Sequence, residues 1–191
     1  MEAEKVMQAY FSSVSEEIWE KAKGIKLLIT DIDGVMTDGG IIYDDRGLEF
    51  KKYNVKDGLI VQHLRRGGIL VGAITGRESQ VVINRCEELK FDFHYHGVKD
   101  KGRKLQDLLE TMEIDLDNVA YIGDDLIDLP ILSQVGLAVA PSDAVPYVKP
   151  FVHWVTTSKG GEGVFREVAD LILHAKGLLI PIIENLSKKE A

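Results

Sequence analysis

The sequence predicts an α/β fold in which helices flank a mostly parallel sheet. Short apolar runs that are typical of buried strands alternate with segments whose apolar residues recur at helical spacing. The chain has 191 residues, of which 45% are hydrophobic and 28% are charged, so it can bury the core of one domain. No internal repeat, low-complexity segment or linker divides the sequence.

The start of the chain predicts a helix followed by the first buried strand. Ser13 and Glu16 have the spacing of a capping box, which opens a helix that runs to about Lys23 and ends at Gly24. The apolar run 27–29 is typical of a buried strand in a parallel sheet. We therefore expect an N-terminal helical extension, a main domain and a C-terminal tail, with the ranges 1–24, 25–177 and 178–191.

A small β-hairpin is expected where a helix would normally follow the first strand. Residues 41–42 and 48–50 are rich in apolar side chains and flank a polar turn that contains Gly47. An insertion at this point should project from the sheet beside the carboxyl end of the first strand. The pattern fits both a surface flap and a contact between subunits.

The rest of the main domain alternates between helices and strands. Apolar residues at helical spacing predict helices at 56–66, 78–90, 102–112, 126–134 and 164–175. Apolar runs between them predict strands at 69–74, 91–96, 119–122, 137–140 and 152–155. Pro130 is compatible with the fourth of these helices if it lies in the first turns.

The tail is partly apolar and has nothing obvious to cover. Its apolar residues are Leu178, Leu179, Ile180, Ile182 and Ile183. We expect them to contact a neighbouring subunit, and a frayed terminus is the alternative.

Charge and cysteine content narrow the class of protein. The formal net charge of −8 argues against a nucleic-acid partner. The lone Cys86 excludes an intrachain disulfide and fits a reducing compartment. The N-terminus lacks the layout of a signal peptide, and no apolar run approaches the length of a membrane span. We expect a cytoplasmic protein with no nucleic-acid or membrane partner.

Polar clusters follow three of the predicted strands, at the point where each strand ends. The clusters are Asp31 with Asp33, Thr75 with Arg77, and Asp124 with Asp125 and Asp128. In addition, Lys101 begins the helix that precedes the third of these strands. The carboxyl ends of parallel strands lie at one edge of a sheet, where α/β proteins bind ligands, so the clusters should converge.

This combination of groups suits a metal ion and a phosphate. Asp31 and Asp33 face the same way if the strand geometry persists. Two carboxylates so close raise the pKa of one of them unless a cation or a hydrogen-bond donor compensates, which implies a divalent metal ion. Carboxylates from two strands can hold Mg²⁺, while a hydroxyl and a lysine ammonium can hold phosphate oxygens. On the Asp-x-Asp-Gly motif alone, a polar loop leaving the strand is an equal alternative.

Taken in order, these motifs resemble those of the haloacid dehalogenase-like phosphatases, which implies a Rossmann-like fold. The matching positions are Asp31-Ile-Asp33-Gly34, Thr75, Lys101 and Gly123-Asp124-Asp125-x-x-Asp128. Over residues 25–177 the chain is similar in particular to the 3-deoxy-D-manno-octulosonate 8-phosphate phosphatase family. The segments that carry this similarity are DGVMTDG at 33–39, NVKDG at 54–58, ITGR at 74–77, GDDLIDLP at 123–130 and GGEGVFRE at 160–167.

This resemblance implies a Mg²⁺-dependent phosphatase of lipopolysaccharide precursor biosynthesis that lacks a large cap domain. Its substrate would be the sugar-acid phosphate of the family's name, and the chain would assemble as a homotetramer through the hairpin. One alternative is a phosphatase for a sialic-type (KDN or Neu5Ac) 9-phosphate, because Gln62 stands where relatives often place an arginine. Another is a non-catalytic oligomerisation module, which the filled catalytic positions disfavour.

The resemblance also implies catalytic roles for four residues. Asp31 would be the nucleophile that forms an aspartyl phosphate, and Asp33 would be the general acid and base. Thr75 and Lys101 would bind the phosphoryl group that is transferred.

The same resemblance implies a magnesium site. Its ligands would be Asp31, the backbone carbonyl of Asp33, and Asp124. Asp125 and Asp128 would orient the metal waters or the nearby lysine, and helix capping is the alternative role of Asp128.

Sugar recognition is implied for a further segment and for two arginines. The residues Asn54, Val55, Lys56, Asp57 and Gly58 match a family segment that lines the sugar site, although an ordinary helix start would have the same pattern. Arg77 and Arg85 are about two helical turns apart and would suit the carboxylate of the substrate. A solvated helix face is the alternative for Arg85. Asp33 and Lys101 would also contact the substrate.

Two further features have weaker signals. The glycines of 160–163 precede the last predicted helix and either approach an anion or form a plain turn. His94 and His96 alternate along a short strand, and we expect satisfied strand residues rather than a metal pair.

Overall fold

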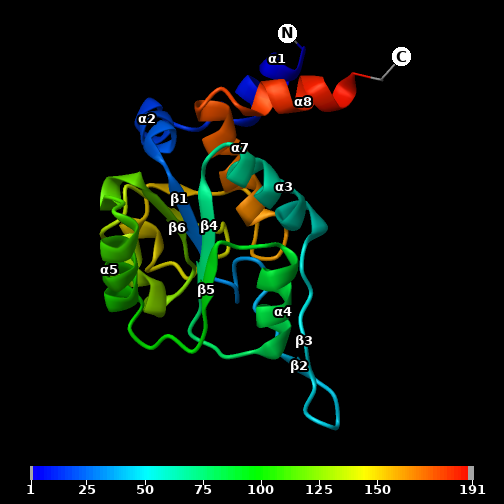
Figure 1. Cartoon of the computed structure of the whole chain (residues 1–191), viewed down its shortest axis with the longest axis vertical. Coiled ribbons are helices and arrows are strands. Elements are labelled where there is room, and N and C mark those ends of the chain that lie inside the picture. The colour runs from blue at the N-terminus through cyan, green and yellow to red at the C-terminus, as the bar shows by residue number, and fades with distance from the viewer. Residues whose placement is uncertain (1, 189–191) are drawn as a thin grey trace.

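The computed structural model describes residues 2–188 and contains a six-stranded parallel sheet (Figure 1). The strand order is β5-β4-β1-β6-β7-β8, and every neighbouring pair is parallel. The strands are β1 (Leu27–Thr30), β4 (Leu70–Ile74), β5 (Phe93–Tyr95), β6 (Val119–Ile122), β7 (Leu137–Ala140) and β8 (Trp154–Val155). Each coincides with a strand that the sequence predicts, so the expected α/β fold is confirmed.

Helices cover both faces of this sheet. They are α1 (Glu2–Tyr10), α2 (Glu16–Gly24), α3 (Val55–Arg66), α4 (Gln80–Glu88), α5 (Lys101–Met112), α6 (Leu129–Leu132), α7 (Val164–Ala175) and α8 (Leu179–Ser187). The helices α2, α3, α4 and α7 share one hydrophobic core with the sheet, and α5 and α6 share another. Within residues 2–188, no helix combines the length and the apolar character needed to cross a membrane.

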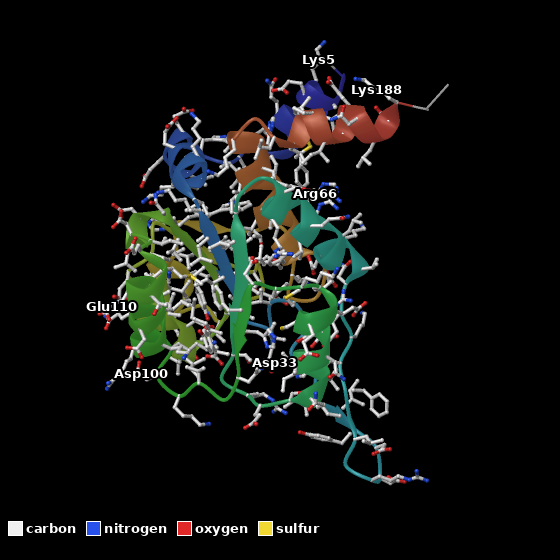
Figure 2. All side chains as sticks on the ribbon, viewed as in Figure 1. Lys5, Asp33, Arg66, Asp100, Glu110 and Lys188 are labelled. Carbon is white, nitrogen blue, oxygen red and sulfur yellow. The ribbon has the colours of Figure 1, made fainter. Side chains whose placement is uncertain are left out.

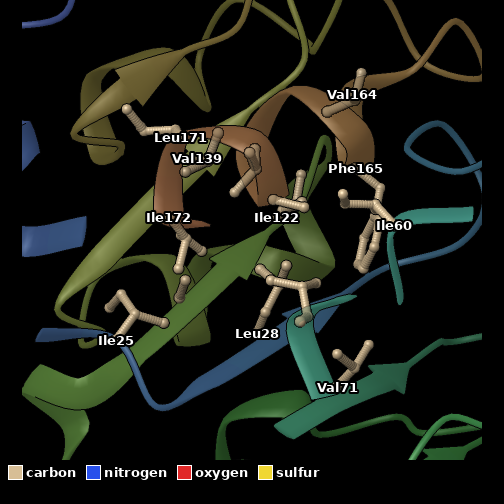
Figure 3. Packing of buried hydrophobic residues seen from close by; sticks show 14 of the residues in the cluster. Ile25, Leu28, Ile60, Val71, Ile122, Val139, Val164, Phe165, Leu171 and Ile172 are labelled. Carbon is tan, nitrogen blue, oxygen red and sulfur yellow. The ribbon is translucent and has the colours of Figure 1, made fainter. Parts of the chain in front are cut away.

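The side chains of β1 alternate between these two cores, as the period of a strand requires. Leu28 packs in the same core as Phe165 and Ile172 of α7 (Figure 3), whereas Leu27 and Ile29 pack in the core under α5 and α6. Both faces of β1 are therefore buried, which accounts for its uninterrupted apolar sequence.

The expected hairpin is present and forms a sheet of its own. Strands β2 (Ile42–Tyr43) and β3 (Glu49–Phe50) pair antiparallel and extend away from the main sheet (Figure 1). In the described part of the chain no larger cap domain accompanies it. Five of its apolar side chains are each more than half exposed: Ile41, Ile42, Tyr43, Leu48 and Phe50.

The C-terminal tail forms the helix α8, which lies beside α1 at the end of the molecule opposite the hairpin (Figure 1). Leu179 is buried, and Leu178, Ile182 and Ile183 pack against the core of the same chain. The expectation that the tail has nothing to cover is therefore wrong, because α7 and α1 supply an apolar surface. A contact with a neighbouring subunit stays a prediction, and the last three residues of the tail lie outside the described range.

Candidate active site

The central place of β1 in the sheet determines where the site forms. The chain continues from β1 to β4 and β5 on one side, and then returns to β6 on the other. Open α/β sheets bind ligands at such a reversal of strand order. The ends of β1, β4 and β6 lead directly into the segments that contain Asp31, Thr75 and Asp124. The three clusters that the sequence predicts therefore meet at one edge.

These strand ends enclose a cavity of about 260 Å³. Its lining comes from all three clusters: Asp31, Asp33, Thr75, Gly76, Arg77, Asp124, Asp125 and Ile127. Figure 2 shows Asp33 toward the hairpin end of the molecule, far from Arg66 at the end of α3. Pockets for drug-sized ligands measure roughly 300 to 1,000 Å³. This cavity has room for a group of the size of a phosphate.

A tight turn after β1 directs two carboxylates into the cavity. The amide of Asp31 still pairs with β6, but the carbonyl oxygen of Ile32 accepts from the amide of Met36 at 2.9 Å, so the chain is already turning. Gly34 has a φ of 85°, which favours glycine. The strand geometry therefore does not persist to Asp33. Its side chain reaches the same cavity because of the turn and not because of strand alternation.

Five groups around the end of β1 form what we call the inner cluster: Asp31, Lys101, Tyr121, Asp124 and Asp128. The Nζ atom of Lys101, at the start of α5, lies 3.1 Å from Oδ1 of Asp31 and 2.7 Å from Oδ1 of Asp128. The Tyr121 hydroxyl donates to that same Asp128 oxygen at 2.6 Å. Burial opposes the charge of Lys101, yet the two carboxylates raise its pKa above the usual value. Lys101 is therefore a cation in the core.

Asp128 uses both of its oxygens within the protein. Oδ1 accepts from Lys101 and Tyr121, and Oδ2 accepts from the backbone amides of Asp124 and Asp125 at 3.0 and 3.2 Å. Asp125 and Asp128 also cap the short 3₁₀ turn 126–128 reciprocally. The two roles that the sequence leaves open for Asp128 are thus compatible: it caps the turn and it holds Lys101.

Asp31 and Asp124 have carboxylate oxygens available for a divalent cation. Oxygens of Asp31, Asp124 and Asp128 lie within 4.8 Å of one another, but Asp128 is already saturated. Burial raises the pKa of Asp31 to about 7, although Lys101 opposes the rise, and the charge of Asp128 adds to it. The same causes raise the pKa of Asp124 to about 8. An oxygen-preferring cation such as Mg²⁺ would offset this repulsion, so these residues fit it.

Close backbone contacts hold the loop that follows β1. A Cβ atom at Gly34 would lie 2.1 Å from Oδ2 of Asp124, and one at Gly160 would lie 2.2 Å from the carbonyl oxygen of Gly34. The amide of Gly161 donates to the carbonyl oxygen of Val35 at 2.9 Å. Of the two alternatives for the glycines of 160–163, the structure shows a turn that packs against this loop.

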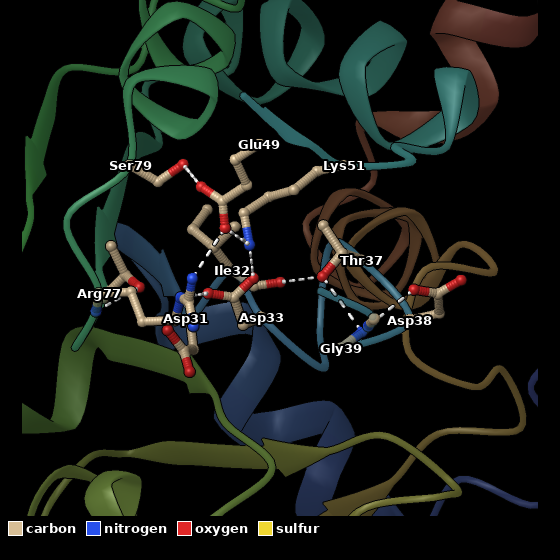
Figure 4. Close-up of polar contacts among 12 residues, drawn as sticks. Asp31, Ile32, Asp33, Thr37, Asp38, Gly39, Glu49, Lys51, Arg77 and Ser79 are labelled. Carbon is tan, nitrogen blue, oxygen red and sulfur yellow. Dashed lines mark hydrogen bonds and ion pairs between the residues drawn. The ribbon is translucent and has the colours of Figure 1, made fainter. Parts of the chain in front are cut away.

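A second group of side chains, which we call the hairpin cluster, surrounds Asp33 and consists of Tyr43, Glu49, Lys51, Arg77 and Ser79. Figure 4 labels the last four of these residues. The buried ammonium of Lys51 contacts Oδ1 of Asp33 and lies 3.5 Å from Glu49. The Nη2 atom of Arg77 donates to Glu49 at 2.8 Å and to the Tyr43 hydroxyl at 3.0 Å.

Four of these residues are not predicted by the sequence analysis. Tyr43, Glu49, Lys51 and Ser79 belong to no motif. Their side-chain hydrogen bonds, with Asp33, with Arg77 or with each other, span 18 to 34 positions of the chain. The one available signal was the hairpin itself, which was expected to project beside the end of the first strand.

The segment 54–58 lies outside the Asp31 cavity of its own chain. Asn54 caps α3 by accepting from the amide of Lys56 at 3.0 Å. Asp57 is buried and accepts from the amide of Arg166 at 2.8 Å. Burial raises the pKa of Asp57 to about 6, against the opposing effects of that amide and of nearby arginines. The helix-start alternative describes these contacts, and the contact with a sugar stays a prediction.

Arg85 also lies apart from Asp31 within one chain. It pairs with Glu88 at 2.8 Å, and a Cβ atom at Gly58 would lie 2.7 Å from its Nη2 atom. Together with Val55 it lines a separate cavity whose other residues are Tyr53, Val81, Asn84 and Glu88. The premise that Arg85 and Arg77 share one helix is wrong, because α4 begins at Gln80 and Arg77 precedes it. A contact of Arg85 with the substrate carboxylate stays a prediction.

His94 and His96 bond to each other. Their ring nitrogens Nδ1 and Nε2 are 2.7 Å apart, which makes one ring the donor and the other the acceptor. The expectation of satisfied strand residues therefore holds only in part, because Nδ1 of His96 is buried without a hydrogen-bond partner among the described residues and His96 follows the end of β5.

Comparison with known proteins gives one family. The model of the haloacid dehalogenase-like hydrolases matches residues 95–168. The 3-deoxy-D-manno-octulosonate 8-phosphate phosphatase KdsC of Yersinia pestis is 44% identical over 169 residues, which are 88% of this chain and 90% of that protein. KdsC of Escherichia coli K12 gives the same identity and coverage.

Solved structures agree over the same extent. The crystal structure of the Yersinia pestis phosphatase matches with a TM-score of 0.86 and 44% identity, covering 87% of this chain and 90% of that one. The phosphatase of Moraxella catarrhalis, crystallised in complex with magnesium ion, phosphate ion and a KDO molecule, matches with a TM-score of 0.87. That match has 38% identity and covers 90% of this chain and 98% of the other.

Proposed function

Because the chain belongs to the 3-deoxy-D-manno-octulosonate 8-phosphate phosphatase family of the haloacid dehalogenase-like hydrolases, we propose that it hydrolyses this sugar-acid phosphate. The products are the free sugar acid and inorganic phosphate, in the synthesis of a lipopolysaccharide precursor. The observation that carries the proposal is the meeting of Asp31, Asp33, Thr75 and Asp124 at one cavity, with Lys101 beside Asp31.

In the first step a carboxylate oxygen of Asp31 attacks phosphorus. The bond from phosphorus to the sugar oxygen breaks, and its electron pair leaves with that oxygen. Asp33, which lines the same cavity, transfers a proton to the departing oxygen, so that the sugar leaves as an alcohol. Asp31 then carries the phosphoryl group.

In the second step water hydrolyses the aspartyl phosphate. Asp33, now a carboxylate, removes a proton from the water as its oxygen attacks phosphorus. The bond from phosphorus to the Asp31 oxygen breaks, and inorganic phosphate leaves. Both aspartates return to their initial state.

The remaining residues bind and orient. Lys101 neutralises charge beside Asp31, while the Thr75 hydroxyl lines the cavity where the phosphoryl oxygens bind. Mg²⁺ would be held by Asp31, the carbonyl of Asp33 and Asp124, and when bound it supplies positive charge that stabilises phosphoryl transfer. Arg77 at the cavity wall is the candidate for the substrate carboxylate.

A panel of sugar phosphates tests the proposal most directly. Purified protein with added Mg²⁺ should release phosphate from 3-deoxy-D-manno-octulosonate 8-phosphate with the highest kcat/KM of the panel. A sialic-type 9-phosphate that is turned over faster would exclude the narrow assignment. Gln62, which keeps that alternative open, is exposed on α3 and does not line the Asp31 cavity.

We further propose that the protein is a cytoplasmic homotetramer assembled through the hairpin. The five exposed apolar side chains of the hairpin form a surface that a second copy of the chain would cover. Sedimentation velocity should give a tetramer for the parent and smaller species for the Ile42→Ser, Phe50→Ser double variant. An unchanged sedimentation coefficient in the variant would rule out this interface.

A further inference from the structure

Lys51 has an environment that the proposed mechanism does not yet use. Its side chain has no exposed surface, although lysine is rarely buried unless it is paired. Its ammonium contacts Oδ1 of Asp33 and lies 3.5 Å from Oε1 of Glu49 (Figure 4). A buried cation is thus held directly against the residue that exchanges protons with the substrate.

The two oxygens of Asp33 have different surroundings as a result. Oδ1 accepts from Lys51. Oδ2 is buried, has no hydrogen-bond partner among the described residues, and lies 3.6 Å from Nε of Arg77. An ammonium group offers only donors, so the oxygen that it contacts is a poor place for a proton that must be given away. Oδ2, whose nearest cation lies 3.6 Å away and makes no hydrogen bond to it, is the oxygen left for exchange with the substrate.

Glu49 keeps Lys51 and Arg77 in place. One of its oxygens lies between the two cations, at 3.5 Å from Lys51 and 2.8 Å from Arg77, and the other accepts from the Ser79 hydroxyl. Ser79 precedes α4 and Arg77 follows β4, so this contact ties the hairpin to the main sheet.

We propose that Lys51 is a positioning residue that holds Oδ1 of Asp33 and thereby fixes the orientation of this carboxyl group for proton transfer to the departing oxygen of the substrate. This inference rests on the proposed function, because it assigns to Lys51 the alignment of the proton transfer that Asp33 performs. Such a transfer requires hydrogen-bond geometry between the acid and the leaving oxygen.

A leaving group that needs no proton separates this role from simple support of the fold. The alkoxide of a sugar must be protonated as it departs, whereas nitrophenolate departs readily without a proton. The rate of leaving-group release in the first turnover isolates this step from the later hydrolysis of the aspartyl phosphate. A loss of packing, by contrast, slows the release of both leaving groups alike.

The experiment compares the parent with Lys51→Met and Lys51→Arg in rapid-quench reactions with Mg²⁺. The two substrates are 3-deoxy-D-manno-octulosonate 8-phosphate and p-nitrophenyl phosphate. Lys51→Met should slow sugar release by about 10²-fold or more, within the range of general acid catalysis. It should slow nitrophenolate release by less than about fivefold, and Lys51→Arg should recover part of the loss because it restores a cation.

The neighbouring Lys52→Met is the matched control, because Lys52 is exposed and should leave both rates unchanged. Glu49→Gln keeps an acceptor for Arg77 and weakens the contact that positions Lys51. It should therefore also slow sugar release more than nitrophenolate release, by a smaller factor than Lys51→Met does. This variant preserves the test if Lys51→Met does not fold. Equal losses on the two substrates, or no loss on either, would overturn the role of Lys51. A parent protein that releases nitrophenolate but no sugar would instead overturn the proposed function.

Discussion

The inner cluster and the hairpin cluster support the same cavity by different means. The inner cluster grows from the ends of β1 and β6 and the start of α5, and its Lys101, Tyr121 and Asp128 are fully buried. The hairpin cluster includes residues of a two-stranded sheet that shares no strand pairing with the main sheet. One member of this cluster, Tyr43, is more than half exposed. Polar contacts within the inner cluster join elements of the main sheet and its helices, whereas those of the hairpin cluster join the projecting hairpin to the main sheet.

This difference assigns the two regions to different parts of the reaction. The nucleophile Asp31 and the cation Lys101 beside it require fixed positions, which the rigid ends of the strands provide. Proton transfer and the fit of the sugar depend on Asp33 and Arg77, and both contact the hairpin. Five apolar side chains of that hairpin are exposed, so a protein bound to them would act on the element that holds Asp33.

The largest expected effect comes from the inner cluster. Asp31→Asn removes the nucleophile, so kcat for phosphate release should fall by about 10⁴-fold or more. The variant should unfold no more easily than the parent in chelator, because the amide removes a buried charge that repels Asp124. Thermal denaturation supplies this control, and retained phosphatase activity would contradict the assignment of Asp31.

Magnesium should distinguish the two clusters. At about 100 times its Kd, Mg²⁺ should raise the free energy of unfolding of the parent by about 2.7 kcal/mol, because it binds the folded state. Asp124→Asn should abolish most of this gain, whereas Glu49→Gln should keep it, since Glu49 is no ligand. Thermal shifts with and without chelator measure both. If both variants lost the stabilisation by Mg²⁺ equally, the assignment of metal binding to the inner cluster alone would be wrong.

Asp57, a buried carboxylate outside the Asp31 cavity, tests whether a raised pKa is a property of active-site residues alone. The folded pKa of Asp57, about 6, exceeds the ordinary value of 3.8, so its contribution to stability is present at pH 4 and is lost as the pH rises through 6. Asp57→Asn should therefore match the parent near pH 4 and exceed its free energy of unfolding by about 2 kcal/mol at pH 8. Urea denaturation at both pH values checks this. A raised KM for the sugar phosphate would instead support the predicted role of Asp57 in binding.

The smallest effect is expected at the exposed edge of the hairpin cluster. Tyr43→Phe removes one hydrogen bond to Arg77, and Arg77 keeps its contact with Glu49. KM should rise by about fivefold at most, because a solvent-exposed hydrogen bond contributes about 1 kcal/mol or less. Steady-state kinetics measure the change. A loss as large as that of Lys51→Met would show that the hairpin acts as one unit.

The sequence alone determined the strands, most helices, the hairpin and the convergence of the acidic clusters. These features depend on local patterns, because burial on both faces of β1 requires an apolar run and a turn at its end requires Gly34. The motif residues Asp31, Thr75 and Asp124 were found for the same reason, since each directly follows a strand or the glycine after one.

Only the tertiary structure decided which of these groups touch. It saturates Asp128 with Lys101 and Tyr121, and it sets Lys51 against Asp33. It also gives the segment 54–58 other partners and packs the tail against its own core. Such contacts join residues that are far apart in the chain, and they depend on where the hairpin and the helices fold back. Periodicity along the sequence is a local property, so it does not predict which distant residues come into contact.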